Sequence, residues 1–293
     1  MNKIISFLFI LLCSQTNAQI ASKAEMVWHE DSLVILSNKI LAGESDSVRI
    51  LANSQFHSLL KQALSFDNAI EYPFSKLPAI SKLEDADKNF KILNWSLRFD
   101  DGRFKYFAFM LYRTKEGVTM QEWIDTSVET REFPDQEVFG NDNWYGAYYY
   151  KLIEKKNKLK KRQYLLLGWD GYEFDSNQKI IEVLNIDKEG IVTFGAPILE
   201  IKEETKHRFF LRFKEDAVVT LRYFEEQQQI VFDHLIPMQR IMEGVYQFYV
   251  SDFSYDGFQF SNWKWEFVEQ IDARNQNDNT KKPKKIEKRL FRD

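Results

Sequence analysis

The sequence predicts an α+β protein that is mainly β, with a short helical N-terminal region followed by a large antiparallel β-sheet domain. Between residues 19 and 80, apolar residues recur at spacings of three and four, as on one face of a helix. Between residues 81 and 273, short runs of alternating polarity are separated by tight turns. Few helical stretches separate these runs, which favours antiparallel pairing, because parallel strands need long crossover connections. Residues 274–293 form a basic tail whose composition is typical of disorder.

The first 18 residues have the parts of a secretory signal peptide. Lys3 supplies the positive charge, residues 4–12 (IISFLFILL) form the apolar stretch, and small residues at Thr16 and Ala18 suit a signal peptidase that cuts before Gln19. The apolar stretch is too short to span a bilayer, which takes about 18 or more apolar residues. We therefore expect an exported protein, periplasmic or extracellular, whose mature chain has no transmembrane span.

The single cysteine, Cys13, lies inside this signal peptide. A mature chain without cysteine has no disulfide bond, no zinc–thiolate site and no cysteine nucleophile. Cys13 also raises the alternative of an acylated outer-membrane lipoprotein. The large side chain of Leu12 disfavours it, because lipoprotein processing requires a small residue before the cysteine.

Two helices are expected in the N-terminal region. Residues 47–66 carry one apolar stripe, and Asp46 or Ser47 is expected as the N-cap, because such side chains accept hydrogen bonds from the N–H groups of the first turn. The stripe consists of Val48, Leu51, Ala52, Phe56, Leu59, Leu60, Ala63 and Leu64. A weaker pattern predicts another helix over residues 23–41, ended by Gly43.

The β domain is predicted to begin with a hairpin. Residues 90–97 and 104–112 lie on either side of Asp100-Asp101-Gly102, whose glycine suits the positive φ of a tight turn. Further strands are expected at residues 144–153, 163–169, 179–186, 191–194, 207–213, 217–224, 230–235, 245–250, 257–260 and 263–268. Residues 116–143 show no readable regularity. A sandwich, a barrel, a meander and a partial propeller all remain open.

Basic residues are concentrated in two runs, although the net charge is −4. Residues 155–162 hold six basic residues and no acid, and residues 274–293 hold eight basic against three acidic residues. Such runs bind nucleic acid or anionic lipid in some proteins. In an exported protein we expect a solvated hairpin tip and a loose tail, with no nucleic-acid partner.

Aromatic residues make up 15% of the chain, and several are expected to share a strand face. Strand alternation places Tyr148 and Tyr150 on one face, and does the same for Trp263 and Trp265. Exposed rings in a row form a platform for sugars or peptides, whereas buried rings fill a core. The leading hypothesis is a non-enzymatic exported protein that binds a glycan, a peptide or an envelope protein through Tyr148, Tyr150, Trp169 and Trp263.

One turn combines several oxygen ligands of the kind that calcium prefers. Asp170, Glu173, Asp175 and Asn177 lie within eight residues, but without the spacing of an EF-hand. A calcium site and an ordinary turn held by side-chain hydrogen bonds are the two interpretations. No other cofactor is expected.

The alternative function is a hydrolase of glycans or envelope polymers that uses paired carboxylates. Such pairs carry no local signature, so the absence of hydrolase motifs does not exclude them. Asp233 and His234 are adjacent in a predicted strand and point to opposite faces, so they do not form an acid–base pair with each other. The expected candidates are Asp170, Asp233, Asp252 and Asp256, with His234 acting beside a distant partner such as Asp252 or Asp256. A third hypothesis is a structural envelope component whose basic tail touches anionic lipid.

Four segments carry a resemblance to a known group of proteins. They are residues 164–171 (YLLLGWDG), 194–198 (FGAPI), 231–237 (VFDHLIP) and 254–258 (SYDGF). Together they resemble a family of uncharacterised secreted proteins of Bacteroidota-type bacteria, over most of the chain after Ser81. The resemblance implies an exported envelope protein, and it implies neither an activity nor any site residue.

Overall fold

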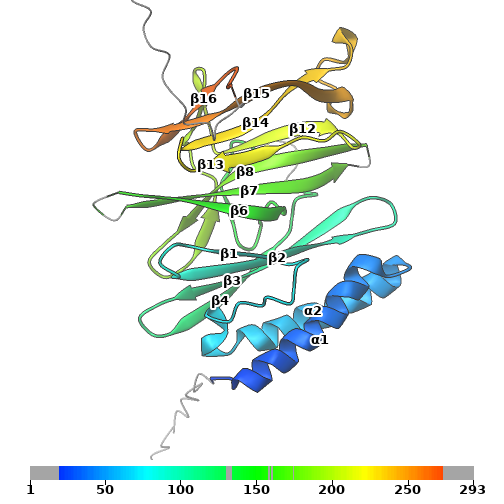
Figure 1. Ribbon diagram of the computed structural model, residues 1–293, viewed down its shortest axis with the longest axis vertical. Helices are drawn as coiled ribbons and strands as arrows, with labels where there is room; N and C mark the ends of the chain where they lie inside the picture. Colours follow the sequence, from blue (N-terminus) through cyan, green and yellow to red (C-terminus); the bar gives the residue numbers. More distant parts are fainter. Residues whose placement is uncertain (1–19, 130–133, 158, 160, 174, 273–293) are drawn as a thin grey trace, which may run out of the picture.

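The computed structural model describes residues 20–129, 134–157, 159, 161–173 and 175–272 (Figure 1). The predicted signal peptide (residues 1–18) and basic tail (residues 274–293) lie outside these residues. Two long helices precede a set of mainly antiparallel strands, which confirms the prediction of an α+β, mainly β fold. None of the helices in the described part of the chain has the length and apolar character needed to cross a bilayer.

The elements form four stacked layers, with the two helices on one side followed by three sheets (Figure 1). The first sheet contains β1 (Ser81–Glu84), β2 (Phe90–Arg98), β3 (Phe104–Arg113) and β4 (Val118–Ile124), in that order. The middle sheet has the order β5 (Phe139–Gly140), β9 (Val192–Phe194), β8 (Ser176–Ile186), β7 (Arg162–Glu173) and β6 (Tyr148–Lys156), and β12 (Arg208–Lys214) also pairs with β8. The third sheet has the order β11 (Glu204–Lys206), β10 (Leu199–Ile201), β16 (Lys264–Val268), β15 (Tyr249–Ser261), β14 (Gln229–Pro237) and β13 (Leu221–Phe224).

The helical hairpin covers one face of the first sheet. Helix α1 (Lys23–Ala42) ends at Gly43, as predicted, and α2 spans Asp46–Leu64. The N-cap of α2 is Ser45 rather than Asp46 or Ser47, because the helix already begins at Asp46 and the Ser45 hydroxyl accepts a hydrogen bond from the Val48 N–H group. The C-terminal part of the predicted α2 stripe is buried, and its Phe56 contacts Trp95 of the first sheet edge-on at 5.2 Å between ring centroids. Val48 and Leu51 of the predicted stripe are exposed instead.

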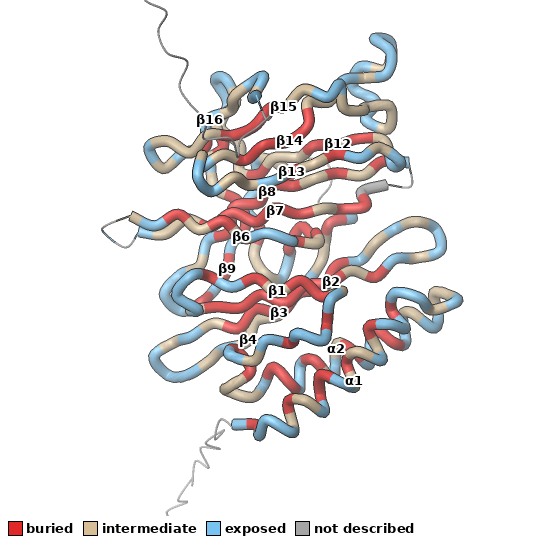
Figure 2. Tube along the Cα trace, viewed as in Figure 1, coloured by how far each residue is buried: buried red, intermediate tan, exposed pale blue. Residues whose placement is uncertain are grey.

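Each sheet has a hydrophobic core on the side that faces the next layer, so strands of the first and middle sheets are buried on both faces (Figure 2). In β7, the consecutive residues Leu165, Leu166 and Leu167 have no exposed surface. Residues 90–95 of β2 are likewise buried without interruption. Strict alternation of polarity is lost in these strands because both faces contact apolar neighbours.

Two stretches differ from the sequence-based expectation. Residues 116–143, which showed no readable pattern, contain β4 and the short β5. The basic run at residues 155–162 is only partly a solvated tip. The Lys155 ammonium is buried against the rings of Tyr223, Phe260 and Trp265, with Nζ 4.8, 5.0 and 5.4 Å from their centroids. Aromatic faces attract cations, so this lysine holds β6 against the third sheet, and its burial lowers its pKa.

Three one-turn 3₁₀ helices complete the described chain: η1 (Asp67–Ile70), η2 (Arg240–Met242) and η3 (Tyr246–Phe248). The first leads from α2 toward the first sheet. The other two lie in the long connection between β14 and β15, which projects from one end of the third sheet (Figure 1).

Candidate functional site

Two of the four predicted aromatic residues lie together at one end of the middle sheet. Tyr148 on β6 is the cross-strand partner of Trp169 on β7, and both side chains are partly buried. The ring of Phe104, from β3 of the first sheet, meets Trp169 edge-on at 4.9 Å. A Cβ atom on Gly171 would lie 2.3 Å from the Phe104 ring, so glycine at this position allows the close approach.

The other two predicted residues lie elsewhere. Tyr150, 36% exposed, faces the third sheet, and its hydroxyl donates a hydrogen bond to the Leu221 carbonyl at 3.0 Å. Trp263 lies in the turn before β16 instead of sharing a strand face with Trp265, and its carbonyl accepts a hydrogen bond from Gln163 at 3.1 Å. Gln163 is six residues from Trp169 along β7, or about 20 Å. The four aromatic residues therefore do not form one platform.

A cavity of about 420 Å³ lies between the tip of the helical hairpin and the β2–β3 hairpin. It is lined by Ile40, Leu41, Arg49, Ser96, Arg98, Phe99, Asp100 and Phe104. Strand β1 pairs with β2 only as far as Ser81 opposite Asn94, so Ser96 and Arg98 lie on a part of β2 that β1 does not cover. Phe104 links this cavity to Trp169, and through it to Tyr148.

Arg49 of α2 joins the two hairpins that enclose the cavity. Its guanidinium donates hydrogen bonds to the carbonyl oxygens of Gly43 (2.8 Å) and Arg98 (3.1 Å). It also pairs with the carboxylates of Asp46 (2.5 Å) and Asp100. The hydrogen bond from Arg49 lowers the pKa of Asp100 below its ordinary value. These contacts occupy the Arg49 guanidinium and join the helical hairpin to the β2–β3 hairpin.

Arg98 presents the second cation of the cavity. Its side chain is exposed, and within the described residues its guanidinium has no hydrogen-bond or ion-pair partner. Arg98 is the cross-strand partner of Phe104, so the two residues are neighbours on one face of the sheet, and both line the cavity. The neighbouring Arg103 differs, because it forms an ion pair with Asp101 at 2.6 Å.

Sequence reasoning missed Arg98 and Phe104, although a signal for them was present. The turn at Asp100-Asp101-Gly102 was identified, and extending its hairpin pairing outward by symmetry would have set Arg98 opposite Phe104. Their place beside the helical hairpin carried no local signal, because Arg49 and Asp100 are 51 residues apart in the sequence.

A buried network lies next to this aromatic cluster and includes Asp170. The Asp170 carboxylate, with no exposed surface, accepts hydrogen bonds from the hydroxyls of Tyr106 (2.8 Å) and Tyr145 (3.3 Å) and from the Gln178 amide (2.7 Å). Burial, together with the charge of Asp170, raises the pKa of Tyr106 well above its ordinary value. The ring of Tyr106 stacks near that of Phe104, with 6.5 Å between centroids, so the network supports the cavity wall.

The predicted calcium ligands are held in different surroundings. Asp170 belongs to the buried network, Asp175 is exposed in the turn, and the Asn177 amide donates a hydrogen bond to the Glu215 carbonyl at 2.8 Å. The side chain of Glu173 lies outside the described part of the structure. Among the side chains that are described, no three His, Cys, Asp or Glu residues are arranged to hold a metal ion. Calcium binding stays a prediction.

Of the carboxylates proposed for hydrolysis, Asp170 lies apart in the middle sheet. Asp233, Asp252 and Asp256 lie on the paired strands β14 and β15, and Asp256 reaches His234. The His234 Nδ1 atom lies 2.6 Å from a carboxylate oxygen of Asp256, and this hydrogen bond raises the pKa of the imidazole. Asp233 points elsewhere and accepts hydrogen bonds from Thr220 (2.6 Å) and Ser251 (2.8 Å). The side chains of Asp233 and His234 thus bind different partners, as strand alternation predicted.

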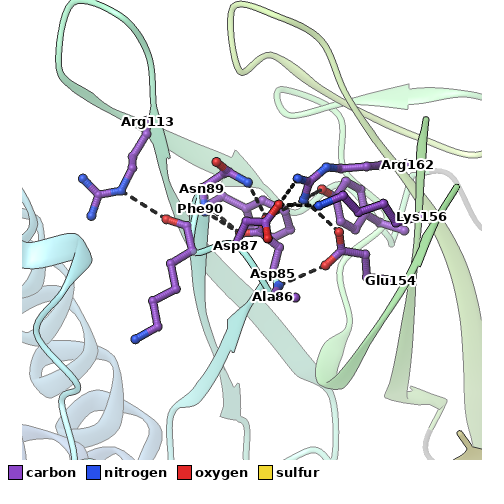
Figure 3. Close-up of polar contacts among 11 residues, drawn as sticks. Asp85, Ala86, Asp87, Asn89, Phe90, Arg113, Glu154, Lys156 and Arg162 are labelled. Atoms are coloured by element: carbon purple, nitrogen blue, oxygen red, sulfur yellow. Dashed lines mark hydrogen bonds and ion pairs between the residues drawn. The ribbon is translucent and has the colours of Figure 1, made fainter. Parts of the chain in front are cut away.

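At the opposite end of the sheets, Arg162 gathers three carboxylates (Figure 3). Its guanidinium contacts Asp85 (3.0 Å), Glu154 (2.8 Å) and Asp87, while Lys156 also pairs with Asp87 at 2.7 Å. The Asp85 side chain is fully buried and also accepts hydrogen bonds from Asn89. Because these charges satisfy one another, the cluster is best explained as a link between the first and middle sheets.

The cavity beside Phe104 therefore combines aromatic rings, a hydroxyl and an arginine that can meet a ligand. Comparison of the chain with protein-family models, curated proteins and solved structures finds no match.

Proposed function

We propose that this chain is an exported envelope protein that binds a glycan, without converting it chemically, in the cavity beside Phe104. The observation that carries the proposal is the pairing of Arg98 with Phe104 in the wall of a hollow of about 420 Å³. This volume lies within the range of about 300–1,000 Å³ that small-molecule sites occupy. The binding residues differ in part from those expected, because Tyr150 and Trp263 lie away from the cavity.

The lining suits a sugar better than a purely apolar molecule. An aromatic face contacts the C–H groups of a sugar ring, while polar groups at its edge bind the hydroxyls. Here Phe99 and Phe104 supply rings, and Ser96 and Arg98 supply hydrogen-bonding groups. Trp169 and Tyr148, beyond Phe104, extend the aromatic surface for a second sugar unit.

Calorimetric titration with a panel of oligosaccharides and peptides tests this proposal. The Phe104→Leu variant keeps apolar volume but loses the ring face, and it is expected to weaken glycan binding roughly threefold to tenfold. Phe107→Leu is the matched control, because Phe107 lies on the same strand but stacks on Trp95 at 5.4 Å, away from the cavity. Binding of no glycan by the unaltered protein, or equal losses in both variants at unchanged melting temperature, would contradict the proposal.

A hydrolase is the second candidate, and the observation that favours it is the hydrogen bond between His234 and Asp256. A carboxylate on one ring nitrogen orients an imidazole so that the other nitrogen acts as acid or base. The His234 side chain is 42% exposed, which leaves the ring accessible to substrate. If this candidate is right, the protein releases reducing ends from a glycan or peptidoglycan fragment, and His234→Gln abolishes the release while His207→Gln does not. Absence of turnover by the unaltered protein would count against it.

A further inference from the structure

The charged side chains around the cavity are nearly all paired within the protein. Asp46 and Asp100 both contact Arg49, and Asp101 contacts Arg103. These pairs engage the carboxylates of the β2–β3 turn, Asp100 and Asp101, and that of Asp46 at the start of α2. Arg98 differs, because its guanidinium has no hydrogen-bond or ion-pair partner among the described residues.

The position of Arg98 restricts the chemistry of a partner. Arg98 and Phe104 are cross-strand partners, whose Cβ atoms lie about 5 Å apart on one face of the sheet, and both residues line the cavity. A sugar ring stacked on Phe104 would bring a substituent at its edge within reach of the guanidinium. A planar carboxylate is the group that arginine binds best, through two parallel hydrogen bonds.

We infer that the ligand is an acidic glycan, one that carries uronic acid units, and that Arg98 selects it by binding the sugar carboxylate. This inference rests on the proposed function and adds the substrate class to it. The cavity accepts the acidic unit, and the aromatic surface at Trp169 and Tyr148 contacts the next sugar unit. Arg98 is thus a specificity-determining residue, whereas Arg49 has a structural role.

Paired ligands that differ only in charge test the inference. Oligosaccharides of galacturonate, glucuronate and mannuronate are titrated calorimetrically into the protein, each beside its methyl ester, which keeps the sugar and removes the negative charge. We expect at least one acid to bind about tenfold or more tightly than its ester, because a hydrogen bond to a charged group contributes that much. Raising the salt concentration should weaken binding of the acid and leave that of the ester nearly unchanged.

Two arginine variants test whether Arg98 is the residue that prefers the acid over its ester. Arg98→Gln should bind acid and ester with equal affinity, whereas Arg103→Gln should retain the preference for the acid. Arg103 is the matched control because it lies on the same hairpin, carries the same charge and does not line the cavity. Melting temperatures of both variants verify that each is folded.

The outcomes separate this inference from the proposed function. Tight binding of a glycan with no preference for the acid overturns the inference and leaves the proposed function standing. Binding of no glycan in either form overturns both. Equal loss in the two arginine variants, or equal binding of an acidic peptide such as oligoglutamate, indicates attraction by charge alone and also overturns the inference.

Discussion

Close contacts at single residues shape the end of the molecule where the cavity lies. Gly171 follows the buried Asp170 and contacts the Phe104 ring, and its N–H group donates a hydrogen bond to the Tyr106 hydroxyl at 2.9 Å. Asp170 was expected to lie in a turn, but here Asp170 and Gly171 continue β7. Gly171 serves packing between sheets rather than a positive φ.

Gly171→Ala is expected to destabilise the protein by about 1–3 kcal/mol, the usual cost of overpacking. The new methyl group would lie 2.3 and 2.5 Å from two carbons of the Phe104 ring, which must move away. Urea unfolding of Gly171→Ala, Phe104→Leu and the double variant measures the effect. If the contact with Phe104 is the cause, the loss is smaller in the Phe104→Leu background. Equal losses in both backgrounds would contradict this explanation.

The His234–Asp256 pair is expected to stabilise the folded protein more at low pH than at high pH. The hydrogen bond to Asp256 raises the pKa of His234, and the charges of Asp252 and Glu269 act in the same direction. A raised pKa in the folded state means that the pair stabilises the protein fully below the unfolded value of about 6.5. The contribution is lost as pH rises through the folded value.

Asp256→Asn should therefore lower stability more at pH 5.5 than at pH 8.5, and it should move the pKa of His234 back toward about 6.5. Proton NMR of the imidazole follows the pKa, and unfolding at both pH values follows the stability. A His234 pKa that is unchanged by this substitution, or a larger loss at high pH, would show that the pair does not act in this way.

Charge clusters act at the scale of whole elements by joining neighbouring sheets. Arg162 on β7 contacts the turn between β1 and β2 through Asp85 and Asp87. Removal of Arg162 leaves the buried Asp85 carboxylate without its cation, which is costly inside a protein. Lys156, with its side chain 40% exposed, joins the same turn through the partly exposed Asp87.

Arg162→Met is expected to cost about 3 kcal/mol of stability, because one partner of a buried pair is removed. Lys156→Met, the matched control on the adjacent strand, should change stability little, since exposed ion pairs contribute little. Thermal and urea unfolding compare the two variants. Similar effects would mean that the burial of Asp85 does not govern the cluster.

The sequence predicted helices and strands well where one face of the element is exposed to water. It predicted them less well where both faces are buried or the pattern is irregular. The hairpin around Gly102 and most of the α2 stripe were predicted correctly, since periodicity and turn chemistry are local, but Val48 and Leu51 of that stripe are exposed. Strand β4, which lies in a stretch without visible alternation, was missed. Lys155 was expected in solvent because charge runs usually are solvated, whereas contacts with three rings of another sheet bury it.

At the scale of the whole molecule, the proposed export makes a prediction about the mature chain. Mass spectrometry of the protein recovered from the envelope or medium should find a chain that starts at Gln19, whose side chain can cyclise onto the new N-terminus. Cys13→Ser should leave export and fractionation unchanged. A mature chain that starts at a lipidated Cys13 would contradict cleavage after Ala18 and establish the lipoprotein alternative.

Local chemistry along the chain accounts for the fold class, the two helices and most hairpins, because periodicity and turn preference depend on residues a few positions apart. The stacking of three sheets under a helical layer does not follow from such local chemistry, because it depends on contacts between residues far apart in the sequence. The contacts that build the cavity and its support join Arg49 to Asp100 and Tyr106 to Asp170, at separations of 51 and 64 residues. Such pairs meet only when whole layers pack, since burial of apolar faces sets which strands become neighbours.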